Sequence, residues 1–489
     1  MQTRQGIFVD NAWRSSSSDK TITVIDPATE QVFGSASHGS AEDVDVAVTS
    51  AHRALTQGPW PAMDLDERIA IVVRLGELVD ARREELARLT SSSMGAPLRD
   101  TMTLYKAREV FDTYIDAARK LTTEFVRFDA DGDTLIRKRP VGVVAGITPW
   151  NAPIRHELKK IVPAILAGCT IVLKPSPETP FGASVLAELC AEAGTPPGVV
   201  NLVLGGAEVG SALVNHPLVR KISFTGSSGV GVGIAQAAAA DFRRLQLELG
   251  GKSAAIVLDD VDLDQVIPSL DAGIFWNAGQ ACVATSRVLV AQTRYQEVVD
   301  AMAEAARATV VGDPFDARTT MGPLVAKRQL DRVLGYIEKG RSEGAKLVQG
   351  GGTPSNLDRG WYVEPTVFAD VDNSMTIAQE EIFGPVVSII PFRDEDQAVA
   401  LANDSSFGLG GAVHSADPLR ALEVAKRVDS GYISVNQFGI GLSAPFGGVK
   451  KSGVGREHGI EGLDAFLEYV PHPIPHELAE QLAVSLPRG

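Results

Sequence analysis

Three short stretches of the chain carry side chains that could do chemistry together. Cys282 follows a Gly-Gln turn signal within the apolar run 275–284, and a cysteine thiolate attacks carbonyl carbon readily. Glu248 stands between two leucines and ahead of a Gly-Gly pair, where burial would raise its pKa toward that of a general base. Asn151 lies between two nearby prolines and carries the neutral N–H donor that suits an oxyanion. A lone cysteine is more often a small buried hydrophobe, and the two companion stretches favour a catalytic Cys282 instead.

These stretches resemble motifs of the aldehyde dehydrogenase superfamily. They read Pro149-Trp150-Asn151, Glu248-Leu249-Gly250-Gly251-Lys252 and Gly279-Gln280-Ala281-Cys282. Further matches cover most of the chain, from about Asp26 to Glu457, and include Lys174-Pro175-Ser176, Phe224-Thr225-Gly226-Ser227, Glu381-Ile382-Phe383-Gly384-Pro385 and Pro445-Phe446-Gly447-Gly448. One motif would be weak, whereas this many in the expected order is a specific signal. Members that acylate CoA generally lack the glutamate base, so the presence of Glu248 implies the hydrolytic type, which releases a free acid.

Bulk composition limits the classes of partner. The chain has 489 residues and a net charge of −15, which argues against nucleic acid and anionic membrane surfaces as partners. Its three cysteines make no disulfide framework and suit a reducing compartment. Cys169 and Cys190 lie in a strand-like and a helix-like run, so both are predicted to be structural. No apolar run reaches the ~18 residues of a membrane span and no apolar leader is visible, so we expect a cytoplasmic protein.

The order of the elements predicts an α/β protein. Residues 64–120 have helical periodicity, interrupted at 94–97, and strands and helices alternate from residue 141 onward, as in a parallel sheet with crossover helices. We predict strands at 141–147, 170–173, 199–204, 221–224 and 254–258, and helices at 180–193, 208–215, 234–240, 298–308 and 330–344. The stretch from residue 463 starts strand-like and ends in a proline-broken tail.

The resemblance implies an aldehyde dehydrogenase-like division of this α/β chain. Residues 1–121 and 141–250 would form a Rossmann-like NAD(P)-binding domain, and residues 251–447 an α/β catalytic domain. Residues 122–140 and 465–489 would form a small β oligomerisation flap and the C-terminal tail. The expected partners are then an aldehyde and further copies of the chain, in a homodimer or homotetramer.

The usual dinucleotide fingerprint is incomplete, because the glycines at 229, 231 and 233 fall one residue short of it. A triphosphate-binding loop is excluded by Gln246, which stands where that motif needs glycine. The remaining candidate for a phosphate-binding segment is the strand-to-helix turn 224–231, where backbone amides at the helix start could face a pyrophosphate. The resemblance implies that cofactor-binding residues are Ile147, Pro149, Trp150, Lys174, Ser176, Glu178, Phe224, Gly226, Ser227, Val230, Leu249, Glu381 and Phe383.

One departure from the family pattern concerns the choice of cofactor. Many NAD-preferring members place a glutamate three residues after the lysine, where it binds the ribose 2′-hydroxyl. Here that position is Pro177, and the acidic residue is Glu178, one step later. A missing carboxylate removes a repulsive element against the 2′-phosphate of NADP. We expect NAD, with NADP as the alternative, and the chemistry requires no metal.

The implied reaction begins with attack of Cys282 on the aldehyde, giving a thiohemiacetal whose oxyanion binds Asn151 and the backbone N–H of Cys282. Hydride transfer to nicotinamide then leaves a thioester, which water hydrolyses with Glu248 as general base. By resemblance Glu457 is a secondary acid on a proton-exit path, and Lys159 or Lys160 is a stabiliser of its helix.

The substrate class is inferred from the expected tunnel, which the resemblance implies is lined by Ala152, Arg155, His156, Lys159, Trp276, Ala281, Val283, Ile440 and Phe446. Its apolar residues, with the small Ala152, favour a bulky hydrophobic aldehyde, aromatic or terpenoid-like. Arg155 and His156 leave two alternatives open: they hold the carboxylate of a semialdehyde, or they face solvent from their helix. Rivals of another class are a non-catalytic scaffold and a cysteine esterase, since fold does not fix function.

Overall fold

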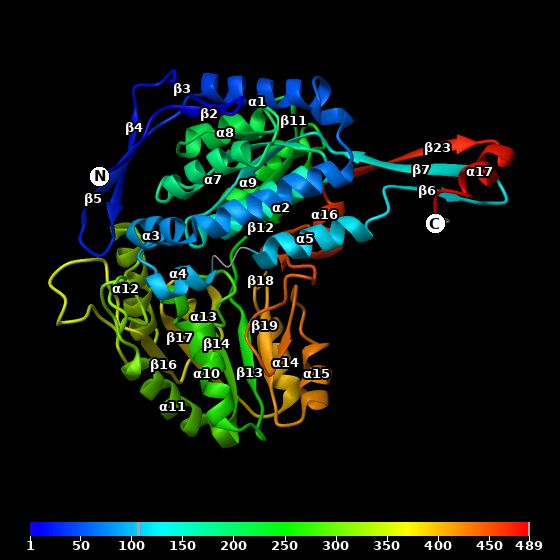
Figure 1. The fold of residues 1–489 in the computed structure, drawn as a ribbon. Coiled ribbons are helices and arrows are strands. Elements are labelled where there is room, and N and C mark those ends of the chain that lie inside the picture. The colour runs from blue at the N-terminus through cyan, green and yellow to red at the C-terminus, as the bar shows by residue number, and fades with distance from the viewer. Residues whose placement is uncertain (105–107, 488–489) are drawn as a thin grey trace.

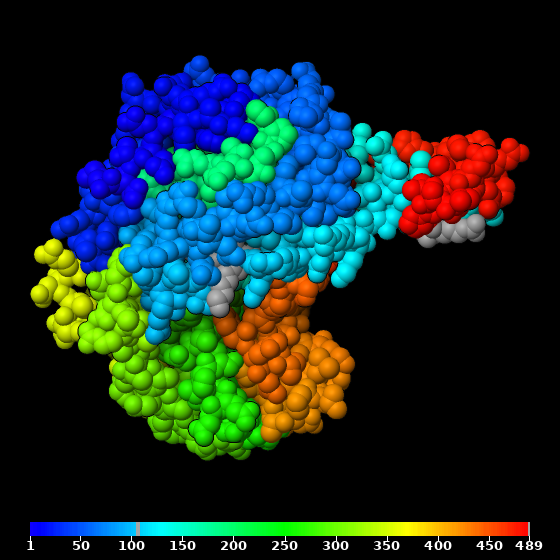
Figure 2. Space-filling model, in the orientation of Figure 1, coloured from blue at the N-terminus to red at the C-terminus, as the bar shows by residue number. Residues whose placement is uncertain are grey.

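Two large β-sheets, each covered by helices, form the two halves of the molecule, and a narrow β arm projects from one side (Figures 1 and 2). The computed structural model describes residues 1–104 and 108–487. No helix within these described residues is long and apolar enough to cross a membrane.

The first sheet has eight strands in the order β22-β12-β11-β8-β9-β10-β2-β3. Its five central strands are parallel, and four of them, β8 to β11, overlap the strands predicted before residue 250. The edge strands β22, β2 and β3 run antiparallel to their neighbours. The bounds are β2 (Ile7–Val9), β3 (Ala12–Arg14), β8 (Val143–Ile147), β9 (Thr170–Lys174), β10 (Val200–Leu202), β11 (Val219–Thr225), β12 (Arg244–Glu248) and β22 (Gly453–Val454).

Helices cover this sheet, and local signals explain where several of them begin and end. A capping box between Asp64 and Glu67 starts α2, and Gly95, at φ 90°, ends α3 at the predicted interruption. The glycine-rich α9 begins at Ser228, six residues before the predicted start at residue 234. The bounds are α1 (Ala41–Thr56), α2 (Leu65–Ala81), α3 (Arg83–Met94), α4 (Leu98–Leu104), α5 (Arg108–Lys120), α6 (Pro153–Leu166), α7 (Pro180–Glu192), α8 (Ala207–Asn215) and α9 (Ser228–Ala239).

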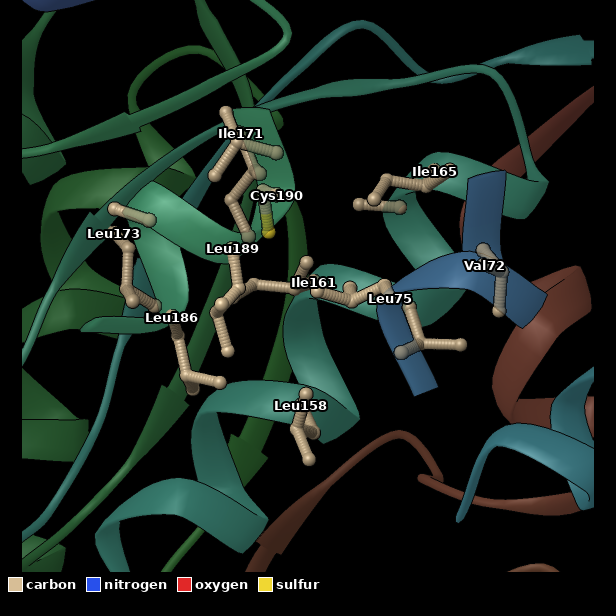
Figure 3. Close-up of a cluster of buried hydrophobic side chains, with 14 of the residues drawn as sticks. Val72, Leu75, Leu158, Ile161, Ile165, Ile171, Leu173, Leu186, Leu189 and Cys190 are labelled. Atoms are coloured by element: carbon tan, nitrogen blue, oxygen red, sulfur yellow. The ribbon is translucent and has the colours of Figure 1, made fainter. Parts of the chain in front are cut away.

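An apolar cluster between α2, α6, α7 and β9 fixes the positions of these elements (Figure 3). Cys190 points into this cluster from α7, and burial raises the pKa of its thiol to about 12. Cys169 is also buried, and its Sγ donates to the backbone oxygen of Phe466 at 3.3 Å. Both environments suit the structural role predicted for these two cysteines.

The second sheet has seven strands in the order β15-β16-β17-β14-β13-β19-β20, all parallel except β15. Its strands are β13 (Ala254–Val257), β14 (Arg287–Ala291), β15 (Lys346–Gln349), β16 (Thr366–Ala369), β17 (Val386–Phe392), β19 (Gly411–His414) and β20 (Ser434–Val435). Its helices are α10 (Leu263–Ile274), α11 (Tyr295–Ala308), α12 (Lys327–Ser342), α13 (Thr376–Gln379), α14 (Glu395–Asn403) and α15 (Pro418–Ala425). Both sheets follow the predicted segments, while the division into domains stays a prediction.

The arm is an antiparallel sheet of β6 (Glu124–Arg127), β7 (Asp133–Pro140) and β23 (Leu467–Ile474), in the order β23-β7-β6. It projects clear of the body in the space-filling view (Figure 2). The proline-broken tail predicted after it is wrong in part, because α17 (His476–Leu482) follows directly. Pro475 occupies the N-cap of this helix, where the missing N–H costs nothing. The role of the arm as an oligomerisation flap stays a prediction.

Smaller elements complete the fold. One sheet joins β1 (Gln2–Arg4), β4 (Thr21–Asp26) and β5 (Gln31–Ser37), and β18 (Phe407–Gly408) pairs with β21 (Val449–Lys450). The chain then returns to the first half, where α16 (Gly459–Asp464) packs against α5. This return brings residues near 447–458 back beside β12.

Candidate active site

A sharp turn brings Cys282 to the space between the two halves. The 3₁₀ turn Trp276–Gly279 has three consecutive residues in the left-handed region: Asn277 (φ 55°), Ala278 (φ 53°) and Gly279 (φ 66°). Such a conformation is strained for Asn277 and Ala278 and needs support from its surroundings. Gly279 is required in addition because a Cβ there would lie 2.1 Å from the backbone oxygen of Gly384.

Side-chain amides supply that support. Asn277 Nδ2 donates to the backbone oxygens of Asn151 at 3.0 Å and of Gln280 at 3.2 Å. Gln280 Nε2 donates back to the Asn277 oxygen, and its Oε1 accepts the backbone N–H of Val325. Asn151 Nδ2 donates to the Gln280 oxygen at 3.0 Å. The loop of Cys282 and the loop of Asn151 are therefore tied to each other, and one N–H of the Asn151 amide is already engaged.

Glu248 ends β12, paired in register with Thr225 of β11. It is 2% exposed, and neither carboxyl oxygen has a hydrogen-bond partner within the described residues. Burial raises the pKa of Glu248 well above its usual value, and the charge of Glu457 adds to this rise. Lys160 and Lys159 lower the pKa in opposition. A carboxyl group in this environment exchanges a proton nearer neutral pH than an exposed one.

The side chain of Cys282 is half-buried, and burial raises the pKa of its thiol to about 12, with the charges of Glu381 and Glu248 adding to the rise. Lys159 acts in the opposite direction. At neutral pH the thiol is therefore protonated in this state of the protein. A nucleophilic role requires that a base remove its proton as it attacks.

Cys282, Glu248 and Asn151 meet at one cavity of about 290 Å³ between the two halves. Seven of the predicted cofactor residues line the same cavity: Pro149, Trp150, Gly226, Ser227, Leu249, Glu381 and Phe383. The remaining lining residues are Thr225 and Gly250, which belong to the quoted motifs but were not among the predicted site residues, and Gln329 and Arg332, which no quoted motif contains.

The segment 381–383 forms one wall of this cavity. A side-chain oxygen of Glu381 accepts the backbone N–H of Gly251 at 3.0 Å, and a Cβ at Gly250 would lie 2.4 Å from the other oxygen. Phe383 has φ 62°, and its ring meets that of Trp150 edge to face at 5.3 Å. The Gly-Gly pair is thus explained by the close approach of a carboxylate.

Two residues of α12 hold that wall in place. Gln329 Nε2 donates to the backbone oxygen of Phe383 at 2.8 Å, and Arg332 donates to the backbone oxygens of Glu381 and Ile382. Nothing in the local sequence of α12 indicates this role, because it depends on how the helix packs against a segment some 50 residues away.

Six predicted cofactor residues lie outside the lining of this cavity within the described chain. Ile147 and Phe224 are buried at the ends of β8 and β11. Lys174 is buried at the end of β9, and its Nζ donates to the backbone oxygens of Pro175 and Gly205 at 2.9 and 2.8 Å. Ser176 and Glu178 follow Lys174, and Val230 is 54% exposed on α9.

A buried charge cluster, defined here as Lys159, Lys160, Glu248 and Glu457, lies behind the cavity. Lys160 Nζ is within 3.2 Å of Ser223 Oγ, 3.0 Å of Thr225 Oγ1 and 3.0 Å of Glu457 Oε1. Lys159 Nζ lies 4.0 Å from the other oxygen of Glu457. Lys160 therefore joins α6 to β11 and to Glu457, while the role of Lys159 or Lys160 as a stabiliser of the helix stays a prediction.

The predicted substrate residues lie around and beyond this cluster. Arg155 is half-buried and His156 is 8% exposed, so the expectation that His156 faces solvent is wrong. Burial lowers the pKa of His156 well below its usual value, assisted by the charge of Lys159, so the ring is neutral. The ring of Phe446 lies 5.5 Å from Lys159 Nζ.

The other predicted substrate residues are small or partly covered. Ala152 and Ala281 are buried, and Trp276, Val283 and Ile440 are half-buried. The ring of Phe446 lies 5.8 Å from that of Tyr432, a neighbour that the sequence did not indicate. None of the nine predicted tunnel residues lines the cavity of Cys282 in the described chain, and their contact with substrate stays a prediction.

Comparison with known proteins gives the class to which this fold and site belong. A family model described as the aldehyde dehydrogenase family matches residues 13–470. A geranial dehydrogenase of Castellaniella defragrans is 46% identical over 468 residues, which are 95% of this chain and 98% of that protein. The chain therefore belongs to the aldehyde dehydrogenase family and is an oxidoreductase.

Solved structures agree with this assignment. An aldehyde dehydrogenase of Mycobacterium tuberculosis complexed with NAD+ is 41% identical, with a TM-score of 0.93 over 97% of this chain and 98% of that one. A betaine aldehyde dehydrogenase of Staphylococcus aureus in complex with NAD+ is 36% identical, with a TM-score of 0.93 over 96% and 94% of the two chains. The predicted α/β, aldehyde dehydrogenase-like fold class is confirmed.

Proposed function

We propose that this protein oxidises an aldehyde to the carboxylic acid with NAD as hydride acceptor, using Cys282 as nucleophile. The observation that carries the proposal is the meeting of a thiol, a buried carboxyl group and an amide donor at one cavity. The same cavity has an aromatic wall of Phe383 and Trp150, which suits a flat nicotinamide ring. Relatives that are complexed with NAD+ support this choice of cofactor.

The residues present fit a dinucleotide. The side chain of Ser227 makes no capping bond at the start of α9 within the described residues, so the first N–H groups of this helix are free to bind a pyrophosphate. A Cβ at Gly229 would meet open space. Lys174 and Glu381 would hold the two riboses, and Phe383 would lie beside the nicotinamide. When bound, NAD supplies an acceptor for the hydride of the thiohemiacetal.

In the first step Cys282 Sγ bonds to the aldehyde carbon as its proton leaves. Glu248 is our candidate to take that proton, because it lines the same cavity and its oxygens are unengaged among the described residues, whereas an oxygen of Glu381 accepts the N–H of Gly251. The carbonyl oxygen becomes an oxyanion, which the second N–H of the Asn151 amide stabilises. The bond of Asn151 to the Gln280 oxygen fixes the direction of that N–H.

In the second step the acyl group is a thioester on Cys282. Glu248 first passes the thiol proton on toward Glu457 and then removes a proton from water, and the water oxygen attacks the thioester carbon as the C–S bond breaks and Cys282 leaves as a thiolate. The proton then passes toward Glu457, whose charge raises the pKa of Glu248 and whose Oε2 lies 4.0 Å from Lys159. Proton transfer through this cluster thereby returns Glu248 to its deprotonated form for the next cycle.

For the substrate we propose a bulky hydrophobic aldehyde, aromatic or terpenoid-like. The small side chains of Ala152 and Ala281 leave room, and the rings of Phe446 and Tyr432 offer an apolar surface. The 46% identical geranial dehydrogenase supports this class.

A second candidate, a semialdehyde, is favoured by one observation. His156 and Lys159 are both less than 9% exposed, and Lys159 Nζ lies 5.5 Å from the ring of Phe446; with Arg155 they could bind a carboxylate. Burial of Lys159 lowers its pKa to about 8, so its cation persists at neutral pH. A carboxylate-bearing substrate would meet that charge.

Reduced-nicotinamide absorbance over an aldehyde panel tests both candidates. The panel compares geranial and benzaldehyde with succinic semialdehyde, each with NAD and NADP, for the wild type and for Lys159→Met. We expect the neutral aldehydes to have the higher kcat/KM. A preference for the semialdehyde that falls at least about tenfold in Lys159→Met would transfer the proposal to the second candidate. Absence of NADH formation with every aldehyde would contradict the proposed function.

We also propose self-association through the projecting arm. Tyr469 is 52% exposed on β23, and Leu478 and Val484 are 41% and 88% exposed on and after α17. An arm with exposed apolar side chains gains stability when a second copy covers it. Light scattering of the full chain and of a Tyr469→Glu, Leu478→Glu variant tests this, and an unchanged mass would contradict it.

A further inference from the structure

A buried histidine next to Glu457 has a backbone conformation that residues other than glycine rarely adopt. His458 has φ 63° and ψ 169°, and it immediately precedes α16. Its N–H donates to the hydroxyl of Tyr114 at 3.2 Å, and its carbonyl oxygen accepts the N–H of Gly462 at 2.8 Å, so both backbone groups are held in place. Glycine would adopt this conformation without strain, so a histidine at the position indicates that its side chain has a role.

The imidazole of His458 has unused hydrogen-bonding groups. The residue is 3% exposed, and neither ring nitrogen has a hydrogen-bond partner in the part of the chain that the structure describes. Burial lowers the pKa of His458 well below its usual value, and the charge of Lys159 adds to this change. The ring is therefore neutral at pH 7, with one nitrogen that donates and one that accepts. Nδ1 of His156 is likewise buried and without a partner among the described residues.

Two further rings connect His458 with the nucleophile. The ring of Phe446 lies 5.4 Å from that of His458 and 5.8 Å from that of Tyr432. Burial raises the pKa of the Tyr432 hydroxyl, and a negative charge on Cys282 adds to the rise, which places Tyr432 near the thiol. The three rings therefore lead from the reacting thiol to the unpartnered nitrogens. A flat aromatic substrate would pack well along them.

The unpartnered nitrogens suit a hydroxyl group better than a carboxylate. A hydroxyl both donates and accepts, as a pair of neutral imidazoles does, whereas a carboxylate only accepts and would leave a ring lone pair facing an anion. The cation beside these rings already has an anion, because Lys159 Nζ lies 4.0 Å from Glu457 Oε2. The polar end of the expected tunnel therefore favours an uncharged group.

We infer that His458 selects the substrate by binding a hydroxyl group at the far end of an aromatic aldehyde; the inference rests on the proposed function. With the aldehyde carbon at Cys282, the aromatic ring packs along Tyr432 and Phe446. The hydroxyl then donates to the acceptor nitrogen of one histidine and accepts the N–H of the other, His458 and His156 being the pair. An aldehyde without this hydroxyl leaves buried nitrogens unpartnered and is disfavoured.

The test compares 3- and 4-hydroxybenzaldehyde with their methyl analogues, which have nearly the same shape. We expect the wild type to have a kcat/KM at least about tenfold higher for one of the hydroxy aldehydes than for its methyl analogue. In His458→Gly, whose backbone suits the position, that ratio should fall to near one. The ratio compares the same two aldehydes in both proteins, so differences in their intrinsic reactivity cancel.

Two additions separate recognition from a structural role. Imidazole added to His458→Gly should restore part of the ratio, and it should leave the ratio of the wild type unchanged. His458→Asn keeps one donor and one acceptor and tolerates a positive φ, so it should retain part of the preference. Thermal unfolding of each variant is measured first, and the ratio of the wild type decides even where a variant does not fold.

Three results would overturn the inference. One is a wild-type ratio within about twofold of one for both pairs, since a twofold change is below the effect of a typical hydrogen bond. Another is an unchanged ratio in folded His458→Gly. The third is a higher kcat/KM for 4-carboxybenzaldehyde than for 4-hydroxybenzaldehyde. If no aldehyde were oxidised, the proposed function would fail as well, whereas oxidation of the methyl analogues without a hydroxyl preference would leave it standing.

Discussion

Replacing Lys160 by methionine removes the cation at the centre of the buried charge cluster. Lys160 and Glu457 are 0% and 1% exposed as side chains, with 3.0 Å between Nζ and Oε1. Methionine occupies a similar volume, so the change acts through charge and hydrogen bonding. It leaves Glu457 with Lys159, at 4.0 Å, as the nearest cation, and it removes the lysine donor to Ser223 and Thr225 at 3.2 and 3.0 Å.

The expected cost follows from these contacts. Removing one partner of a buried pair typically costs about 3–5 kcal/mol, and we expect about 3 kcal/mol here because Lys159 still faces the carboxylate. For a cooperative unit of 150–250 residues this lowers Tm by roughly 6–12 °C. The same change removes a cation that lowers the pKa of Glu248, so the proposed base should become active only at higher pH.

Thermal unfolding followed by circular dichroism measures the first effect, and the pH dependence of steady-state kcat measures the second. Lys339→Met serves as control, because Lys339 is 53% exposed and pairs with Glu343 at 3.4 Å. The double variant Lys160→Met, Glu457→Gln should recover most of the lost Tm, since it leaves no buried unpaired charge. A single variant that melts within 2 °C of the wild type, which corresponds to about 1 kcal/mol or less, would refute this account of the cluster.

Three further predictions concern the reaction itself. Glu457→Gln removes a charge that raises the pKa of Glu248. Because activity rises as Glu248 loses its proton, the rising limb of the pH–rate profile should move to lower pH. A shift to higher pH would contradict this role of Glu457. Asn151→Ala should lower kcat about 10²–10³-fold with NAD+ binding unchanged by calorimetry, whereas a loss below about tenfold would exclude Asn151 as the main oxyanion donor. Alkylation of Cys282 by iodoacetamide without cofactor should accelerate steadily from pH 7 to 10, because its pKa is about 12; a plateau near pH 8 would mean an already ionised thiol.

The sequence was sufficient to predict the scaffold and the three central residues. Regular alternation of apolar strands with helices predicted the parallel strands β8 to β11 and β13, because period and turn residues are local signals. Cys282, Glu248 and Asn151 were marked by residue type and flanking residues, and the structure brings all three to one cavity. Their chemical roles stay predictions until they are tested.

What the sequence did not reveal depends on contacts between distant segments. Gln329 and Arg332 look like ordinary polar residues of α12, and only the packing of that helix against the segment 381–383 makes them part of the site. His156 lies in a run of charged residues that is typical of a solvent-facing stripe, yet α6 is buried on nearly every side. Local periodicity cannot show that Glu457 returns from the end of the chain to neutralise part of that stripe.

The left-handed turn before Cys282 could not be predicted from the sequence either. Asn277 and Ala278 adopt φ values of 55° and 53°, which asparagine tolerates but alanine disfavours, and the turn is held by bonds to the loop of Asn151. The sequence indicated the nucleophile, but not the hydrogen bonds that orient its loop.

The most direct test of the account is a rapid-mixing experiment on Glu248→Gln with NAD and a good aldehyde substrate, with the acid-quenched protein then analysed by mass spectrometry. The substitution slows attack by Cys282, because water must take the thiol proton, and it leaves deacylation without its base. We therefore predict a slowed burst of about one NADH per subunit, little further turnover, and an acyl group on the peptide that contains Cys282. Cys282→Ala, the control, should give no burst and no adduct. Steady turnover of Glu248→Gln at the wild-type rate with an unmodified Cys282 would contradict the proposed roles of both residues.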